Sequence, residues 1–279
     1  MDLGENTLFL YADILGFKNL LKNHKTKIQK IFDIINNSTV FRDDNNKLGL
    51  KAFMFSDTFV IYYSKCEEEI SVVIDMITGL VRHLKHQLSK IDVFIRAQLK
   101  IGDFVYKKLE NIDVFYGDIL VSANDEDKEI QSIGLFFDNK INENNKNFCN
   151  IKYNEKKYFI FDCHELRSFY NASKANRLKN NGNIFPTDYM NSLKPYKNEI
   201  IDEINYLKKI YNLSIGYCKY CIDDQIFFQK LEPHITNKYI SVWNFYYNKY
   251  PELLDYLVKS NFDLKTLCSD REWLEFLNI

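Results

Sequence analysis

LFLYADILGF, at residues 8–17, is the stretch that decides the fold. Its first half is apolar and predicts a short buried strand over residues 7–12, and Asp13 stands where that strand ends. A second apolar stretch, FMFSDTFVI at residues 53–61, carries another aspartate, Asp57. A buried carboxylate must be neutralised, hydrogen-bonded or bound to a cation. Two such aspartates predict a metal site.

Hydrophobic periodicity around these stretches predicts alternating strands and helices. The predicted helices are residues 17–36, residues 67–89 and one that begins near residue 119, and the predicted strands are 7–12, 50–55, 58–63 and 93–101. The two middle strands would form a hairpin with Asp57 at its tip. This order of elements predicts an α+β fold, with a ferredoxin-like (palm-type) antiparallel sheet and helices on one face.

The second half of the chain has a different composition. From Lys174 onward it is rich in asparagine, lysine and tyrosine, and helical patterns follow at residues 196–211 and 241–259. We therefore expect residues 1–174 to form the α+β domain and residues 175–279 to form a helical C-terminal extension packed on it.

The composition excludes several classes of protein. With 279 residues, 46% of them hydrophobic, the chain can bury a substantial core. Its net charge of −1 gives no overall reason to expect nucleic acid or an anionic membrane as a partner. No apolar run reaches about 18 residues and no leader pattern is present, so a cytoplasmic location is expected. Cys218 and Cys221 could be packed thiols, half of a zinc site or a redox pair.

Four motifs together resemble the class III nucleotidyl cyclases. They are YADILGF at 11–17, FSDT at 55–58, RAQLKIG at 96–102 and YGDILVSA at 116–123. They are similar to the family's F-x-D-I-x-G-F strand, its S-D or G-D hairpin, its R-x-x-I-x-x-G strand and its Y-G-x-x-V-x-x-A helix entry, in the same order. The D-I-L-G-F and F-S-D forms look most like the stand-alone bacterial pyrimidine cyclases of Pycsar antiphage systems.

The resemblance implies an active site with two Mg²⁺ or Mn²⁺ ions. Asp13, Asp57 and the backbone carbonyl of Ile14 would be the metal ligands, because these ions prefer oxygen donors. Gly16 and Phe17, at the start of the first helix, would offer backbone N–H groups to the triphosphate.

Two alternatives to this metal site remain open at this point. Asp13 could simply cap the helix that follows, although capping does not account for Asp57. Asp103, in the stretch KIGD at 100–103, also resembles a cyclase hairpin and competes with Asp57 as the second ligand. We prefer Asp57, because the family places both carboxylates before its central helix.

The positions that would contact the base depart from the purine pattern. Purine-specific members have a lysine four residues before the second aspartate and an aspartate three residues before the Y-G glycine. This chain has Phe53 and Val114 there. We therefore expect a pyrimidine packed beside Phe53, with polar contacts from Lys51, Arg96 or Asp113. The alternative is that Phe53 and Val114 are core residues and the alignment is shifted by one residue.

The catalytic asparagine and arginine of the family are also replaced. The family supplies them across a head-to-tail dimer, from the helix after Y-G, and the aligned residues here are Val121 and Asp125. Asn124 and Lys128, on the adjacent helical face, could take these catalytic roles, or they could be ordinary surface residues in the acidic run Asp125-Glu126-Asp127. Arg96 is the strongest alternative cation, either in contact with triphosphate or base or held in a structural salt bridge.

These observations predict a homodimeric, metal-dependent enzyme whose catalytic domain is residues 1–174. It would convert a nucleoside triphosphate, preferably UTP or CTP, into a 3′,5′-cyclic monophosphate and pyrophosphate. By resemblance, this messenger would act on a separate effector in antiphage defence. One alternative is a purine or dinucleotide cyclase or polymerase on the same palm fold, although no GGDEF or GGDD sequence is present. Another is a catalytically inactive cyclase-like module that binds a nucleotide or a protein.

Overall fold

A computed structural model describes most of the chain, in two compact units. The described residues are 7–38, 50–64, 70–137, 141, 148–153, 156–161, 197–222 and 225–263. The units are Met1–Cys163 and His164–Ile279. The predicted boundary between residues 174 and 175 lies outside the described residues, and the packing of the extension on the first domain stays a prediction.

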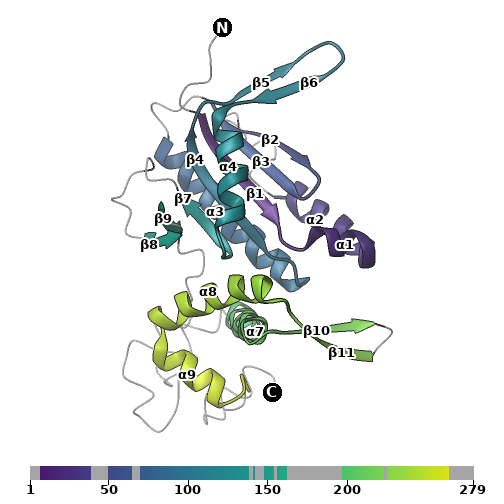
Figure 1. Ribbon diagram of the computed structural model, residues 1–279, viewed down its shortest axis with the longest axis vertical. Helices are drawn as coiled ribbons and strands as arrows, with labels where there is room; N and C mark the ends of the chain where they lie inside the picture. The colour runs from purple at the N-terminus through teal and green to yellow at the C-terminus, as the bar shows by residue number, and fades with distance from the viewer. Residues whose placement is uncertain are drawn as a thin grey trace. The chain divides into compact units, whose positions relative to one another are not determined.

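The described part of the first unit contains a seven-stranded sheet in the order β2-β3-β1-β4-β7-β9-β8 (Figure 1). The strands are β1 (Thr7–Ile14), β2 (Lys51–Phe55), β3 (Thr58–Tyr63), β4 (Ile95–Gly102), β7 (Gly134–Phe137), β8 (Phe148–Tyr153) and β9 (Lys156–Phe161). Neighbouring strands are antiparallel, except that β4 and β7 are parallel. The order β2-β3-β1-β4 is ferredoxin-like, so the predicted α+β class is confirmed.

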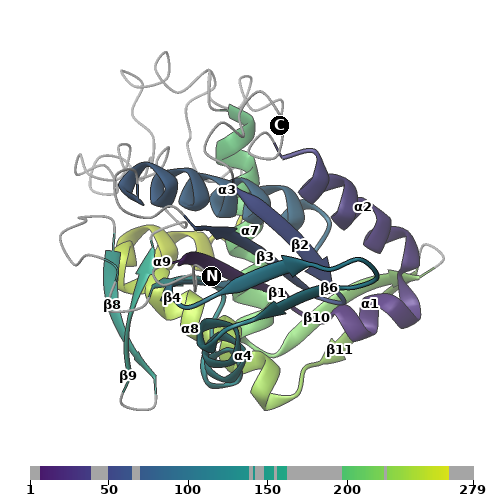
Figure 2. The same cartoon turned by 90° about the horizontal axis from the view of Figure 1, so that it is seen from above.

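Helices cover both faces of this sheet (Figure 2). The helices are α1 (Phe17–Asn23), α2 (Lys25–Asn36), α3 (Ile70–Lys90) and α4 (Asp118–Glu129). Leu8 and Leu10 of β1 belong to the core with α1, α2 and α3, whereas Phe9 and Tyr11 pack with Ile119 of α4 on the opposite face. The expectation of helices on one face is corrected in this respect. The reason is that successive residues of β1 point to opposite faces and both sets are apolar.

The predicted helix over residues 17–36 is two helices. His24 separates them, with φ −142° and ψ 50°, which lie outside the helical region. The predicted helix over 67–89 is described from Ile70, since residues 67–69 lie outside the described residues.

The chain between β4 and α4 forms a two-stranded ribbon, which projects from the sheet (Figure 1). It consists of β5 (Val105–Lys108) and β6 (Asp113–Tyr116). Gly117 joins the ribbon to α4 with a φ of 154°, and a Cβ added there would lie 2.1 Å from the carbonyl oxygen of Asp103. Only glycine fits at this position, because the backbone at residue 117 lies directly against the backbone of Asp103.

The described part of the second unit, which was expected to be helical, consists of three helices and a hairpin. Its elements are α7 (Lys197–Ser214), β10 (Tyr217–Ile222), β11 (Gln225–Lys230), α8 (Pro233–Lys249) and α9 (Pro251–Lys259). The predicted helix over 241–259 is divided before Pro251, because proline cannot donate a backbone hydrogen bond to the preceding turn. Cys218 and Cys221 fall on β10. Among the described helices, none has both the length and the apolarity that crossing a bilayer requires.

Candidate active site

Asp13 and Asp57 lie at the same end of two adjacent strands. Asp13, near the end of β1, pairs with Thr58, the first residue of β3. The N–H of Ile14 donates a hydrogen bond to the carbonyl oxygen of Asp57 at 2.9 Å. The side chain of Asp13 is 18% exposed, and Asp57 is half-buried. The pairing of β1 with β3 therefore brings together two aspartates that are far apart in the sequence.

The buried phenol of Tyr11 lies near both aspartates. Its hydroxyl accepts a hydrogen bond from Thr58 Oγ1 at 3.5 Å. Burial raises the pKa of Tyr11, and the charges of Asp127, Asp13 and Asp57 raise it further. Tyr11 therefore stays protonated beside this group of carboxylates, to which α4 contributes Asp127.

Arg96 connects these carboxylates to α4. It pairs with Asp13 in the β1–β4 register and is only 4% exposed. Its guanidinium donates hydrogen bonds to both carboxylate oxygens of Asp127, to the carbonyl oxygen of Ile130 at 2.8 Å and to Asp13 at 3.4 Å. This is the geometry of the structural salt bridge that the sequence left open as an alternative to a substrate contact.

Arg96 is the first of three buried polar residues of β4, which we call the polar row: Arg96, Gln98 and Lys100. Gln98 donates from Nε2 to the carbonyl oxygen of Ala123 at 2.9 Å, and Lys100 Nζ pairs with a carboxylate oxygen of Glu126 at 2.7 Å. Buried charges are rarely found without such partners. The polar row therefore ties α4 to the sheet beside Asp13.

The donors at Asp13 and Asp57 suit a hard divalent cation. Two carboxylates and the carbonyl of Ile14 form an all-oxygen set, which Mg²⁺ and Mn²⁺ prefer. Within the described residues, no group of three or more histidine, cysteine, aspartate and glutamate side chains is arranged to hold a metal. Mg²⁺ commonly takes only one or two carboxylates and completes its shell with water and substrate phosphates, so the residues fit these ions.

Asp103, the alternative second ligand, lies at the far end of the sheet. It follows Gly102, which pairs with Thr7 at the start of β1, whereas Arg96 pairs with Asp13 at the end of β1. The separation along the strand is about 20 Å. Within one chain, Asp57 is therefore the neighbour of Asp13 and Asp103 is not.

Gly16 and Phe17 mark the start of α1. Gly16 adopts the left-handed conformation, with φ 76° and ψ 15°, and the side chain of Phe17 is buried in the core. The carbonyl oxygen of Gly16 accepts hydrogen bonds from the N–H groups of Asn19 and Leu20. Because α1 has only 7 residues, its dipole is short, and the contact of its N–H groups with a triphosphate stays a prediction.

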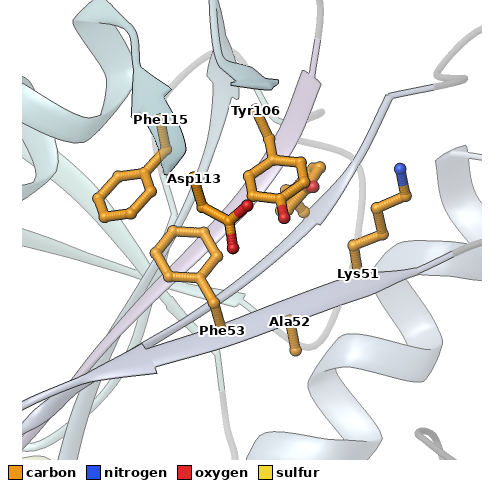
Figure 3. A pocket seen from close by; sticks show the side chains of 7 residues that line it. Lys51, Ala52, Phe53, Tyr106, Asp113 and Phe115 are labelled. Atoms are coloured by element: carbon orange, nitrogen blue, oxygen red, sulfur yellow. The ribbon is translucent and has the colours of Figure 1, made fainter. Parts of the chain in front are cut away.

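Three of the predicted base-contacting residues share one pocket (Figure 3). Lys51, Phe53 and Asp113 line a cavity of about 500 Å³ between β2 and the ribbon. The other lining residues are Ala52, Tyr62, Tyr106 and Phe115. In Figure 3 the carboxylate of Asp113 lies between the rings of Phe53 and Tyr106. Sequence reasoning missed Tyr106 and Phe115, because the register that pairs them across the ribbon is not visible in the sequence.

Aromatic rings pack around Phe53 at this pocket. Phe53 stacks on Phe115 at 4.7 Å and on Phe104 at 6.2 Å between ring centroids, and Tyr62 lies edge-on at 6.3 Å. Burial raises the pKa of Tyr62 to about 12, and the neighbouring Tyr106 adds to this shift. A planar ring can stack on such aromatic faces, so the pocket suits a nucleobase.

Val114 and Arg96 are not among the residues that line this pocket. Val114 pairs with Lys107 in the ribbon, and its neighbours Asp113 and Phe115 both line the pocket. Because side chains alternate along a strand, Val114 points to the other face of the ribbon. Of the residues predicted to make polar contacts to the base, Lys51 and Asp113 line this pocket, and the contact predicted for Arg96 stays a prediction.

Asn124 and Lys128 are exposed on the outer face of α4, which also carries Val121, 62% exposed. Lys128 Nζ pairs with Asp125 at 3.1 Å. The opposite side of the helix, with Ile119, packs on the sheet. A catalytic role for Asn124 or Lys128 would therefore require a second chain, since both side chains point away from their own sheet.

Neither the protein-family models nor the curated protein sequences give a match to this chain. Solved structures with a related fold include the adenylyl cyclase CyaB from P. aeruginosa, which is 11% identical, with 57% of this chain and 94% of that chain covered and a TM-score of 0.42. The guanylate cyclase domain of RhGC from Catenaria anguillulae, in complex with GTP, is 12% identical, with 56% and 96% covered and a TM-score of 0.38.

Proposed function

We propose that this protein is a divalent-metal-dependent nucleotide cyclase. The observation that carries the proposal is the adjacency of Asp13 and Asp57, which stand at the end of β1 and in the β2–β3 turn and are joined through the Ile14–Asp57 hydrogen bond. The reaction would convert a nucleoside triphosphate into a 3′,5′-cyclic monophosphate and pyrophosphate. The four motifs that resemble class III cyclases support the same reaction.

The chemistry of cyclisation requires what this end of the sheet offers. The ribose 3′-hydroxyl attacks the α-phosphate in line while pyrophosphate leaves, so the enzyme must orient the reactants and balance anionic oxygens. When bound, Mg²⁺ or Mn²⁺ ions lower the pKa of the hydroxyl and neutralise phosphate charge. Asp13, Asp57 and the carbonyl of Ile14 would hold two such ions. Tyr11, which stays protonated, adds no further negative charge to the site.

We assign the base to the pocket that contains Phe53, and we propose UTP or CTP as the preferred substrate. The rings of Phe53 and Phe115, stacked on each other, give the pocket an apolar wall against which a base can pack. Lys51 can donate to a pyrimidine carbonyl oxygen, and the carboxylate of Asp113 can accept from the N3–H of uracil or the amino group of cytosine. At the two positions where purine-specific cyclases carry the lysine and the aspartate that select their base, this chain has Phe53 and Val114.

The proposed active form is a homodimer. Asn124 and Lys128 would act on the substrate held by the partner chain, because they lie on the exposed face of α4. The messenger's role in antiphage defence, through a separate effector, is proposed on the sequence resemblance alone.

The test is to incubate the purified protein with ATP, GTP, CTP and UTP separately, with Mg²⁺ or Mn²⁺, and to identify products by mass spectrometry. A cyclic pyrimidine monophosphate is expected. A cyclic purine product would preserve the reaction and refute the assignment of the base. If no nucleotide is converted while calorimetry detects nucleotide binding, the chain either lacks an activator or is an inactive nucleotide-binding module, the second candidate, which the replaced asparagine and arginine favour.

A further inference from the structure

Asp127 lies close to the proposed metal site, although its place in an acidic run of the sequence suggests a solvated surface residue. It falls within the acidic run Asp125-Glu126-Asp127, which resembles an ordinary solvated helix surface. In the structure, however, the Asp127 side chain is only 13% exposed, and its two carboxylate oxygens accept hydrogen bonds from Nε and Nη2 of Arg96. Asp125, two residues earlier on the same helix, is 65% exposed. The two carboxylates therefore differ in burial and in partner.

Arg96 is shared between Asp127 and Asp13. Nη2 of Arg96 contacts carboxylate oxygens of both residues, with the Asp13 contact at 3.4 Å. The contact to Asp127 is bidentate, whereas a single hydrogen bond to Asp13 is recorded. Bidentate pairing of arginine with a carboxylate is the stronger and more directional arrangement. Asp127 thus holds the guanidinium beside Asp13 and accepts two of the four hydrogen bonds that the guanidinium donates.

Because Arg96 is shared, the net charge around Asp13 depends on Asp127 as well, and this net charge affects how strongly Asp13 attracts a cation. One guanidinium between two carboxylates leaves the trio with a net charge of −1. Without the charge of Asp127, the guanidinium and Asp13 would neutralise each other, and the guanidinium would compete with a metal for the Asp13 oxygens. Charges at such short range and low exposure interact strongly because water screens them little.

We infer that Asp127 is a positioning residue for the metal site: by holding Arg96 and offsetting its charge, it keeps Asp13 available as a ligand of a divalent cation. The inference rests on the proposed function, since it presupposes a metal at Asp13. It assigns Asp127 no contact with substrate or metal. Outer-shell groups of this kind commonly change metal affinity by about 10–100-fold when they are replaced.

The experiment is a Mn²⁺ titration of the nucleotide-free protein, followed by electron paramagnetic resonance of unbound Mn²⁺. Asp127→Asn keeps the size of the side chain and removes its charge, and it should weaken binding by about 10-fold or more. Asp125→Asn removes the same charge from an exposed position of the same helix and should leave the affinity within about twofold of wild type, since exposed charges are screened.

A paired replacement separates charge from packing. The double variant Arg96→Met with Asp127→Leu removes one positive and one negative charge and fills the space with apolar groups, which proteins often tolerate. Its Mn²⁺ affinity should lie within about threefold of wild type, because the net charge around Asp13 is restored. If this variant loses as much affinity as Asp127→Asn, packing is responsible and the inference is wrong.

A third variant is expected to bind Mn²⁺ more tightly than wild type, whereas Asp127→Asn is expected to bind it more weakly. Arg96→Met alone leaves both carboxylates without the guanidinium, so Mn²⁺ should bind more tightly, by about 10-fold. Unchanged or weaker binding would overturn the inference even if Asp127→Asn does not fold. Wild-type affinity in Asp127→Asn would overturn it while leaving the proposed cyclase intact. If the wild-type protein binds no Mn²⁺, the proposed metal site fails and the inference falls with it.

Discussion

The N–H of Ile14 and the carbonyl oxygen of Asp57 are joined by a hydrogen bond of 2.9 Å, which fixes the β2–β3 turn against the end of β1. Ser56 in this turn has a φ of 54°, a left-handed conformation that costs a residue with a side chain about 1 kcal/mol or more. Strain of this kind persists where the surrounding structure holds it in place. Here the pairing with β1 holds the turn, and the turn holds Asp57 beside Asp13.

Replacing either aspartate should abolish turnover without unfolding the protein. In Asp13→Ala and Asp57→Ala, metal-dependent cyclisation should fall at least about 1,000-fold, because each removes a proposed metal ligand and cations supply several kcal/mol of transition-state stabilisation. Product formation is measured by mass spectrometry, and folding is measured by circular dichroism. Asp103→Ala is the matched control and should keep its activity. Turnover that survives in either of the first two variants would refute the metal assignment.

Phe53 should control the choice of base. Phe53→Lys introduces a donor at the position where purine-specific cyclases have one, and it should shift the ratio of pyrimidine to purine product by about 10-fold, equivalent to about 1.4 kcal/mol. The ratio is measured with an equimolar mixture of the four nucleoside triphosphates.

Phe55→Lys is the control for this change, since Phe55 lies on the same strand, is exposed and does not line the pocket. An equal shift in both variants, or none in Phe53→Lys, would show that the pocket does not select the base.

Two glycine replacements should change stability in opposite directions. Gly117→Ala should lower the free energy of unfolding by about 2 kcal/mol or more, because the added Cβ overlaps backbone atoms of Asp103 and Phe104. Gly79→Ala, in the interior of α3, should raise it by about 1 kcal/mol, since a Cβ there meets nothing within 4 Å and alanine favours the helix. Urea denaturation measures both. An unchanged free energy of unfolding in Gly117→Ala would contradict the close approach of Gly117 to the backbone of Asp103.

Tyr62 should make stability depend on alkaline pH. Its pKa of about 12 in the folded protein exceeds the ordinary value of 10.0, so the unfolded chain loses the phenolic proton first. The free energy of unfolding should therefore fall as the pH rises from 10 toward 12.

In Tyr62→Phe this decrease should be shallower than in wild type, as measured by urea denaturation at a series of pH values. Tyr116→Phe, at an exposed position, controls for the loss of a phenol. Identical slopes in wild type and Tyr62→Phe would contradict the shift.

The order of elements from β1 to β4 could be predicted from the sequence because each hydrophobic pattern has a distinct period, whereas the ribbon and the hairpins β8–β9 and β10–β11 were not predicted. The hairpin that presents Asp57 is one example, since two apolar runs flank a two-residue turn. The position of α4 on the second face was not predicted, because β4 alternates polar and apolar residues and such a strand normally faces solvent on one side. Its polar row instead faces α4, with partners from distant sequence.

The proposed site was predictable only in part, for the same reason. Asp13, Asp57, Lys51 and Phe53 lie in motifs or at fixed offsets from them. Asp127 was missed because an acidic run resembles a solvated surface. Its spacing of four residues from the buried Ala123 is the signal that could have placed it on the sheet-facing side of α4.

The polar row has a consequence for how α4 docks. An apolar seam between a helix and a sheet can accommodate the helix in more than one longitudinal position, since hydrophobic contact has no direction. If α4 slid by one turn, about 5.4 Å, Asp127 and Glu126 would leave Arg96 and Lys100, and two buried positive charges would lose their partners. Two unpaired buried charges would make that position of α4 energetically unfavourable. The polar row therefore fixes the longitudinal position of α4 on the sheet.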